Sequence, residues 1–191
     1  MTASGDGPLL TLEPLIEAIR EGVEGVGWEL SGLQKTTSHQ FEGRWEGEST
    51  RSAYLFFHPH DGAEHLSVDV YLDETTRGLT GNLALVVDLV RLGEVKSVSD
   101  VLRILGRLSA TTIGDEHRRP VTLRLRLSDA DQDADDATTE VRFKVRIPQK
   151  VLGGGRAAVV PLVCEVMASF AKILESDELA RLAPPEGDHE G

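Results

Sequence analysis

The chain contains a single cysteine, Cys164, among its 191 residues. One thiol excludes a disulfide within the chain and any cluster of thiolate ligands for zinc or an iron–sulfur centre. The chain also lacks an uninterrupted apolar run near the roughly 18 residues of a membrane span, and no basic leader opens it. These absences predict a cytoplasmic protein that does not span a membrane.

Positive charge is scarce in this sequence. Lysine and arginine together number 20 against 32 aspartate and glutamate residues, which leaves a formal net charge of −12. A surface of this charge repels nucleic-acid phosphates and suits a soluble protein that binds basic partners. We therefore expect a protein partner and no nucleic acid.

Familiar catalytic motifs are missing as well. The sequence has no Gly-x-Ser-x-Gly elbow, no His-Glu-x-x-His pair, and no glycine-rich phosphate loop with its lysine. Cys164 lies beside Val163 and Val166 in a predicted helix, where a cysteine is more often a small core residue than a nucleophile. We expect a non-enzymatic protein without a cofactor.

The composition, with 40% apolar and 27% charged residues, is that of an ordinary globular domain. The polar, glycine-rich ends predict disordered tails at residues 1–8 and 183–191. The residues between them, 9–182, are too few for two full domains. We expect them to form a single domain.

Two kinds of apolar spacing alternate along this domain. Spacing of three and four predicts helices at residues 12–25, at 83–108 as one helix or two, and at 157–182. Alternating, aromatic or β-branched segments predict strands at residues 27–35, 39–47, 52–58, 65–73, 121–128 and 140–147. The order α-β-β-β(-β)-α(-α)-β-β-α predicts an α+β fold with helices packed on a mainly antiparallel sheet.

Three of the six histidines fall in one short segment, "HPHDGAEH". His58 and His60 on an extended segment would share one face, and His65 would approach from the other arm of a turn, as zinc ligands must. The intervening Pro and Asp-Gly pair instead favour a solvated hairpin turn. The turn is our preferred interpretation, with a metal site as the alternative.

An acidic segment, "DADQDADDATTE", links the last two predicted strands. Five of its residues match positions 1, 3, 5, 7 and 12 of a calcium-binding EF-hand loop: Asp129, Asp131, Asp133, Asp135 and Glu140. An alanine stands where that loop needs glycine, and strands rather than helices flank the segment. A solvated acidic loop is favoured over a calcium site.

One face of the last two predicted strands is basic. Its cations are Arg124, Arg126, Arg142, Lys144 and Arg146. Like charges opposite one another on neighbouring strands are unfavourable unless negative charge nearby offsets their repulsion. We prefer ion pairing with Asp69 and Asp73 of a neighbouring strand and with Glu140. The alternative is a docking face for an acidic peptide, a phosphate group or a second copy of the chain.

Aromatic residues crowd the early strands. Six of them fall within residues 28–57: Trp28, Phe41, Trp45, Tyr54, Phe56 and Phe57. A surplus over what one sheet face can bury marks a ligand pocket or a partner interface. The basic face together with Trp28 and Trp45 is therefore the predicted partner-binding surface.

In order of elements, acidity and size the chain is similar to the small dimeric secretion chaperones and to the YbjN-like proteins. The resemblance implies helices on an antiparallel sheet, a homodimer, and an unoccupied sheet or groove that holds an extended partner. We therefore expect a chaperone-like or adaptor protein-binding module. Two alternatives stand beside it: a metal-dependent or small-molecule-binding enzyme that uses the histidine turn, and an immunity-type inhibitor of a basic toxin.

Overall fold

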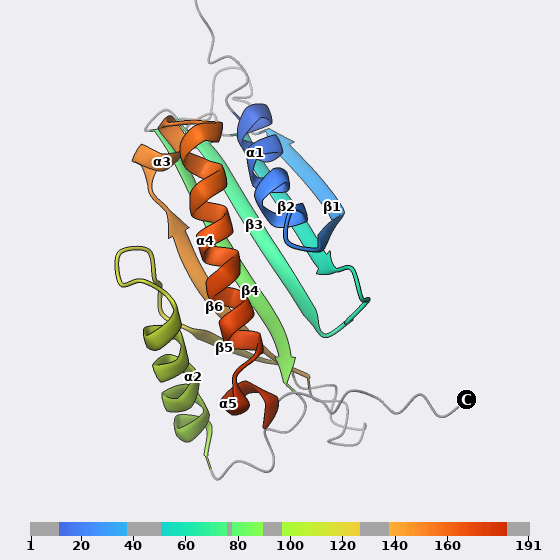
Figure 1. Ribbon diagram of the computed structural model, residues 1–191, viewed down its shortest axis with the longest axis vertical. Helices are drawn as coiled ribbons and strands as arrows, with labels where there is room; N and C mark the ends of the chain where they lie inside the picture. The colour runs from blue at the N-terminus through green and yellow to red at the C-terminus, as the bar shows by residue number, and fades with distance from the viewer. Residues whose placement is uncertain (1–11, 38–50, 76–77, 90–96, 127–137, 183–191) are drawn as a thin grey trace, which may run out of the picture.

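The computed structural model describes residues 12–37, 51–75, 78–89, 97–126 and 138–182 (Figure 1). Its strands are β1 (Trp28–Thr37), β2 (Arg51–Pro59), β3 (Leu66–Thr75), β4 (Gly78–Leu89), β5 (Thr122–Arg126) and β6 (Thr138–Ile147). Its helices are α1 (Leu12–Glu24), α2 (Val98–Thr112), α3 (Gln149–Gly153), α4 (Arg156–Leu174) and α5 (Asp177–Ala180). The predicted α+β class and order of elements are confirmed. The predicted tails and the strand predicted at 39–47 lie outside the described residues.

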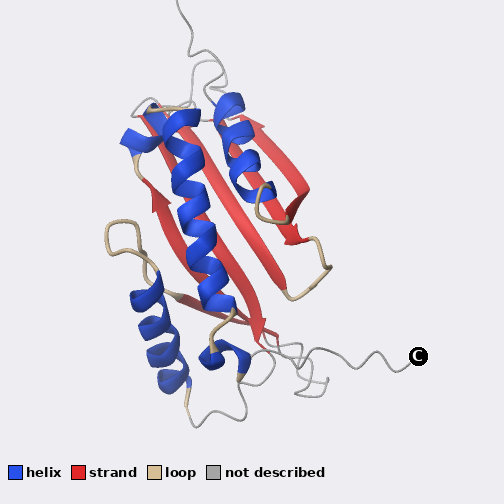
Figure 2. Ribbon diagram, viewed as in Figure 1, coloured by secondary structure: helices blue, strands red, loops and turns tan. Residues whose placement is uncertain are grey.

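The strands form one six-stranded sheet in the order β1-β2-β3-β4-β6-β5. Every neighbouring pair is antiparallel. Figures 1 and 2 show the helices on a single face of this sheet, with α1 and α4 side by side across it. We call this the covered face and the opposite one the open face.

Alternation along the central strands directs their apolar side chains to the covered face. The fully buried side chains there include Ala53, Leu55, Phe57, Val68, Leu72, Leu83, Leu85, Val87, Val141, Phe143, Val145 and Ile147. Helix α1 adds Ile16 and Ile19, and α4 adds Val163 and Phe170. Burial of one such large side chain stabilises a fold by roughly 1.5–3 kcal/mol, so this core is the main source of stability.

Helices α1 and α4 approach closely because residue 22 is glycine. A Cβ atom at Gly22 would lie 2.7 Å from Cγ1 of Val163, and Val163 is itself fully buried. Beside this contact, the Arg156 guanidinium donates to both carboxylate oxygens of Glu21, at 2.6 and 2.8 Å. That bond is the main reason that the pKa of Glu21 lies below its usual value.

The helix predicted at residues 83–108 is wrong in its first part. Residues 78–89 form β4, and the helical residues that follow are those of α2. Residues 83–87 of β4 are apolar on both faces, since Ala84 and Val86 on the open face are only 6% and 7% exposed. Such a run also satisfies helical spacing, so periodicity alone does not distinguish the two structures.

Ser97 caps the start of α2. The Asp100 backbone N–H donates to the Ser97 hydroxyl, which in turn donates to the Asp100 carboxylate at 2.8 Å. These bonds satisfy polar groups that the first turn of a helix leaves unpaired. The Ser97 hydrogen bond also contributes most to lowering the pKa of Asp100.

The single helix predicted at residues 157–182 is divided in the structure. Helix α4 ends at Leu174, and the Ser176 hydroxyl accepts a hydrogen bond from the Leu179 backbone N–H to begin α5. By length and composition α4 is apolar enough to cross a membrane, but a core helix passes the same test. Its apolar side chains pack into the core. Cys164, predicted as a core residue, is exposed on α4.

We expect the Gly22→Ala variant to be less stable than the wild type by about 1–3 kcal/mol, because its new methyl group meets Val163. Gly106→Ala is the matched control, since no atom lies within 4 Å of an added Cβ at that position of α2. The control should gain about 0.5–1 kcal/mol from helix propensity. Urea unfolding measures both. A gain in both variants would contradict the close approach of α1 and α4.

The Glu21 ion pair predicts an acid-dependent contribution to stability. A carboxylate whose pKa is lowered by folding stabilises the fold above its unfolded pKa and loses that contribution as pH falls through the folded pKa. The melting temperature of Glu21→Gln should therefore lie below that of the wild type at pH 7, and the difference should shrink below pH 4.5. Glu17→Gln, whose carboxylate pairs with Arg20 within α1, controls for the lost charge. A difference that does not change with pH would contradict the prediction.

Candidate functional site: a groove on the open sheet face

The open face of the sheet has no helix over it among the described residues (Figure 2). Cross-strand register places rows of side chains on this face. One row runs Phe56, Asp69, Ala84, Lys144, and the next runs Tyr54, Tyr71, Asn82, Arg146. Each row therefore passes from aromatic residues through small residues to cations.

The short side chains between longer ones leave a hollow that we call the sheet-face groove. Its floor is Asn82 and Ala84 on β4, whose short side chains leave space above them. Tyr54, Phe56 and Tyr71 form one wall; Arg142, Lys144 and Arg119 form the other. The groove has a volume of about 480 Å³.

The aromatic wall is packed but still accessible. The rings of Tyr54 and Tyr71 have centroids 4.8 Å apart and are inclined at 40°. Tyr54 and Phe56 are each 37% exposed. Partial burial raises the pKa of the Tyr71 phenol, so this hydroxyl remains a neutral hydrogen-bonding group at physiological pH. Two of the six aromatic residues singled out from the sequence, Tyr54 and Phe56, are therefore accessible on the open face.

Arg142 bridges the groove at one end. Its Nη1 lies 3.0 Å from Oδ2 of Asp69, two strands away, and its Nε donates to Glu140 at 2.6 Å. Because β4 carries only Ala84 and Val86 between them, the guanidinium reaches Asp69 over short side chains. The hydrogen bond to Glu140 is the main cause of the raised pKa of Arg142.

Ion pairing with carboxylates of the sheet, the preferred explanation of the basic face, is thus confirmed for two of its five cations. Arg142 pairs with Asp69 and Glu140, and Arg124 lies 3.6 Å from Glu140. Asp73, the other predicted partner, instead accepts a hydrogen bond from Ser52 at 2.7 Å. Among the described side chains, Lys144 and Arg146 have no ion-pair partner. Arg126 lies on β5, and its side chain is outside the described part.

Of the two predicted tryptophans, Trp28 does not line this groove. Trp28 begins β1 and packs against the core on the covered face. Trp45 lies outside the described residues. Arg119, which the sequence analysis missed, lines the groove because its backbone N–H donates to the Lys144 carbonyl at 2.9 Å. No local pattern marks Arg119, since a contact with a distant strand places it there.

The histidine segment forms the predicted turn between β2 and β3, with Gly62 at a φ of 76°. Nδ1 of His58 lies 3.0 Å from the Leu66 carbonyl oxygen, and Nδ1 of His60 pairs with Glu29. Over the described ranges, no three His, Cys, Asp or Glu side chains are grouped as metal ligands. His58 and His60 therefore have different partners.

The predicted calcium loop is described only at its end. Asp129, Asp131, Asp133 and Asp135 lie outside the described residues. Glu140 lies in β6 and accepts the hydrogen bond from Arg142. In the structure this carboxylate therefore belongs to the charge network of the open face.

Comparison with protein-family models, with curated proteins and with solved structures gives no match to this chain. Inferences about function therefore depend on the geometry of the molecule itself.

The bridge between Asp69 and Arg142 predicts measurable coupling. We expect Asp69→Asn and Arg142→Met each to cost about 1–2 kcal/mol, because each leaves a half-buried charge short of a partner. The double variant should cost about 1 kcal/mol less than the sum. Urea unfolding of the four proteins measures the coupling. Additive costs would contradict a direct bridge. The exposed pair Asp100 and Arg103 on α2 is the control and should couple more weakly.

Proposed function

We propose that the protein is a non-enzymatic binding module that holds an acidic segment of a partner protein in the sheet-face groove. The observation that carries the proposal is the pairing of an accessible aromatic wall with Lys144 and Arg119 across a floor of small side chains. Aromatic and arginine side chains are the residue types that most often anchor protein interfaces.

The charge of this groove favours an acidic occupant. Lys144 and Arg119, which line the groove, form no ion pair with any described side chain, whereas the chain as a whole carries a formal net charge of −12. An acidic segment would offset their repulsion, and its apolar side chains would pack on Tyr54 and Phe56. Burial of apolar surface would supply most of the affinity, and the charges would set orientation and association rate.

An enzymatic role has less support from this site. The groove is lined by tyrosines, one phenylalanine, cations and a single carboxylate, Asp69, which is paired with Arg142. An inhibitor of a basic toxin would use the acidic surface elsewhere, because the groove has the wrong sign of charge for it. A chaperone-like or adaptor role, in a cytoplasmic protein that forms a homodimer, remains our expectation.

Selection from a random peptide library tests the proposal directly. We expect the wild-type protein to enrich peptides that combine Asp or Glu with aromatic or large aliphatic residues. For one enriched peptide, the double variant Lys144→Gln, Arg119→Gln should raise the dissociation constant by about tenfold, which corresponds to roughly 1.4 kcal/mol. Fluorescence anisotropy with a labelled peptide measures this change.

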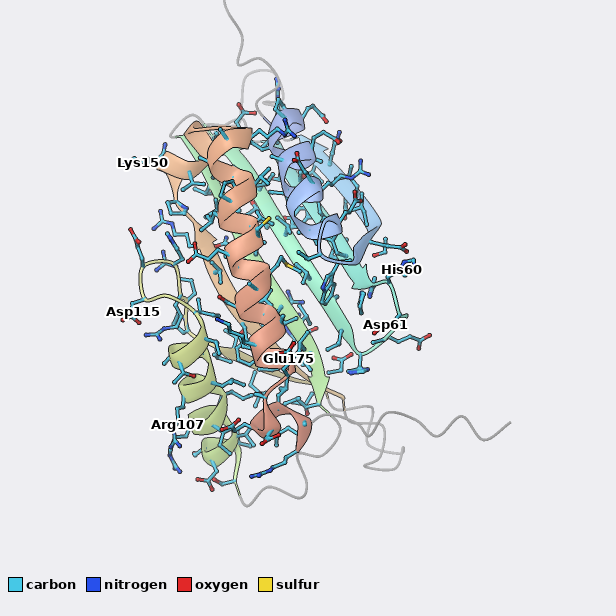
Figure 3. All side chains as sticks on the ribbon, viewed as in Figure 1. His60, Asp61, Arg107, Asp115, Lys150 and Glu175 are labelled. Atoms are coloured by element: carbon cyan, nitrogen blue, oxygen red, sulfur yellow. The ribbon has the colours of Figure 1, made fainter. Side chains whose placement is uncertain are left out.

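The matched control is Arg107→Gln, which removes one positive charge from α2 on the helical side of the molecule (Figure 3). It should leave the affinity unchanged. Enrichment of basic peptides would contradict the proposal, as would equal affinity of the wild type and the double variant. Thermal melting verifies that each variant is folded.

A further inference from the structure

A second hollow lies on the covered side, at the end of the sheet near the β2–β3 turn. We call it the end cavity. Its walls come from the α1–β1 turn, the β2–β3 turn, the last part of β4, the end of α4, and α5. Its volume of about 780 Å³ falls within the roughly 300–1,000 Å³ of small-molecule sites. It shares no lining residue with the sheet-face groove.

The lengths of the elements explain why this space is left open. Helix α1 has 13 residues and spans about 20 Å, whereas β2 and β3 have 9 and 10 residues and span about 30 Å. Figure 1 shows α1 over the upper part of β1 and β2, with no described helix over the β2–β3 turn. Apolar surface beyond the end of α1 therefore lacks a cover in the described structure.

The walls of the end cavity are mainly apolar. Trp28 and Leu66 contribute from the strands, and Leu174 and Leu179 from α4 and α5. Trp28 is only partly buried, so its ring is available to a ligand. Such walls suit an apolar body, and an indole face also attracts organic cations.

The charged groups around the end cavity are negative. Its described lining contains the carboxylate of Asp61, two imidazoles (His60 and His65), and no lysine or arginine. A smaller hollow that shares Trp28 and His60 with it adds Glu24 and Glu29. Arg20 pairs with Glu24, and His60 pairs with Glu29. Asp61 has no ion-pair partner among the described side chains.

Two helix ends add to this negative character. Figure 1 shows α1 and α4 running in the same direction, so that both end on the side of the β2–β3 turn. Figure 3 shows Glu175 at the end of α4, and His60 and Asp61 at the turn. The C-terminal end of a helix carries about half a negative charge. Both helix ends therefore favour a cation in this region.

We propose that the end cavity binds a small amphiphilic amine, with the apolar body against Trp28 and Leu179 and the ammonium group near Asp61. This site is independent of the sheet-face groove. The histidine turn suggested, as an alternative function, an enzyme that binds a metal or a small molecule. The present proposal retains the small-molecule binding and includes no catalysis. Binding involves no covalent step.

Calorimetry with three probes of equal length tests the inference: octylamine, octan-1-ol and octanoate, each below its micelle concentration. We expect octylamine to bind one site per chain, about tenfold more tightly than octanoate. Trp28 fluorescence should change on binding; a Trp45→Phe background removes the other tryptophan of the chain. Binding of all three probes with equal affinity, binding of none, or several octylamine molecules per chain would overturn the proposal.

Two variants locate the site. Asp61→Asn, in an exposed turn, should reduce the preference for octylamine over octanoate at least threefold. Ala63→Phe should block binding because its ring enters the cavity, and Ala110→Phe on the exposed side of α2 is the matched control. Unchanged octylamine affinity in both Asp61→Asn and Ala63→Phe would overturn the location. If Ala63→Phe fails to fold in a thermal melt, Asp61→Asn alone decides.

Discussion

One-sided burial of the sheet is the constraint on which the rest of the structure depends. The apolar side chains of β2, β3, β4 and β6 pack under α1 and α4, and this core contains Phe57, Phe143 and Phe170, all fully buried. The described helices lie on one face only, so the other face must remain stable in contact with solvent or a partner. The chemistry of the open face follows from this requirement.

The open face meets this requirement in two ways. Where β6 approaches β3 across the small residues of β4, charges are paired, with Arg142 held between Asp69 and Glu140. In the sheet-face groove, the rings of Tyr54 and Phe56 on β2 remain partly exposed. Lys144 on β6 lies across from them, beyond the small residues of β4. Charges that are paired within the sheet need no bound partner. Accessible rings beside cations that lack an ion pair would gain stability from a bound partner. This contrast supports the proposal that the groove binds a partner.

The two hollows arise from different features and differ in charge. The sheet-face groove results from short side chains on β4 between long ones, and its charged wall is positive. The end cavity results from helices shorter than the strands that they cover, and its surroundings are negative. The described structure therefore has two separate hollows that share no lining residue and for which occupants of opposite charge are proposed.

The sequence alone predicted the elements with strong local signals. Alternation marked β3 and β6, and the Asp-Gly pair marked the β2–β3 turn. Local signals failed for β4, because a strand that is apolar on both faces has the spacing of a helix. They also failed at residues 175–176, where a serine cap rather than a change in periodicity divides α4 from α5.

The candidate sites were predictable only in part. The sequence identified Arg142, Lys144 and the excess of aromatic residues, since alternation assigns a face within each strand. It could not pair Arg142 with Asp69, place Trp28 on the face opposite Tyr54, or bring Arg119 beside Lys144. Local spacing thus determined most of the elements and, within the strands that it identified, the face of each residue. The tertiary structure decided strand order and register, because these depend on contacts between residues far apart in the chain.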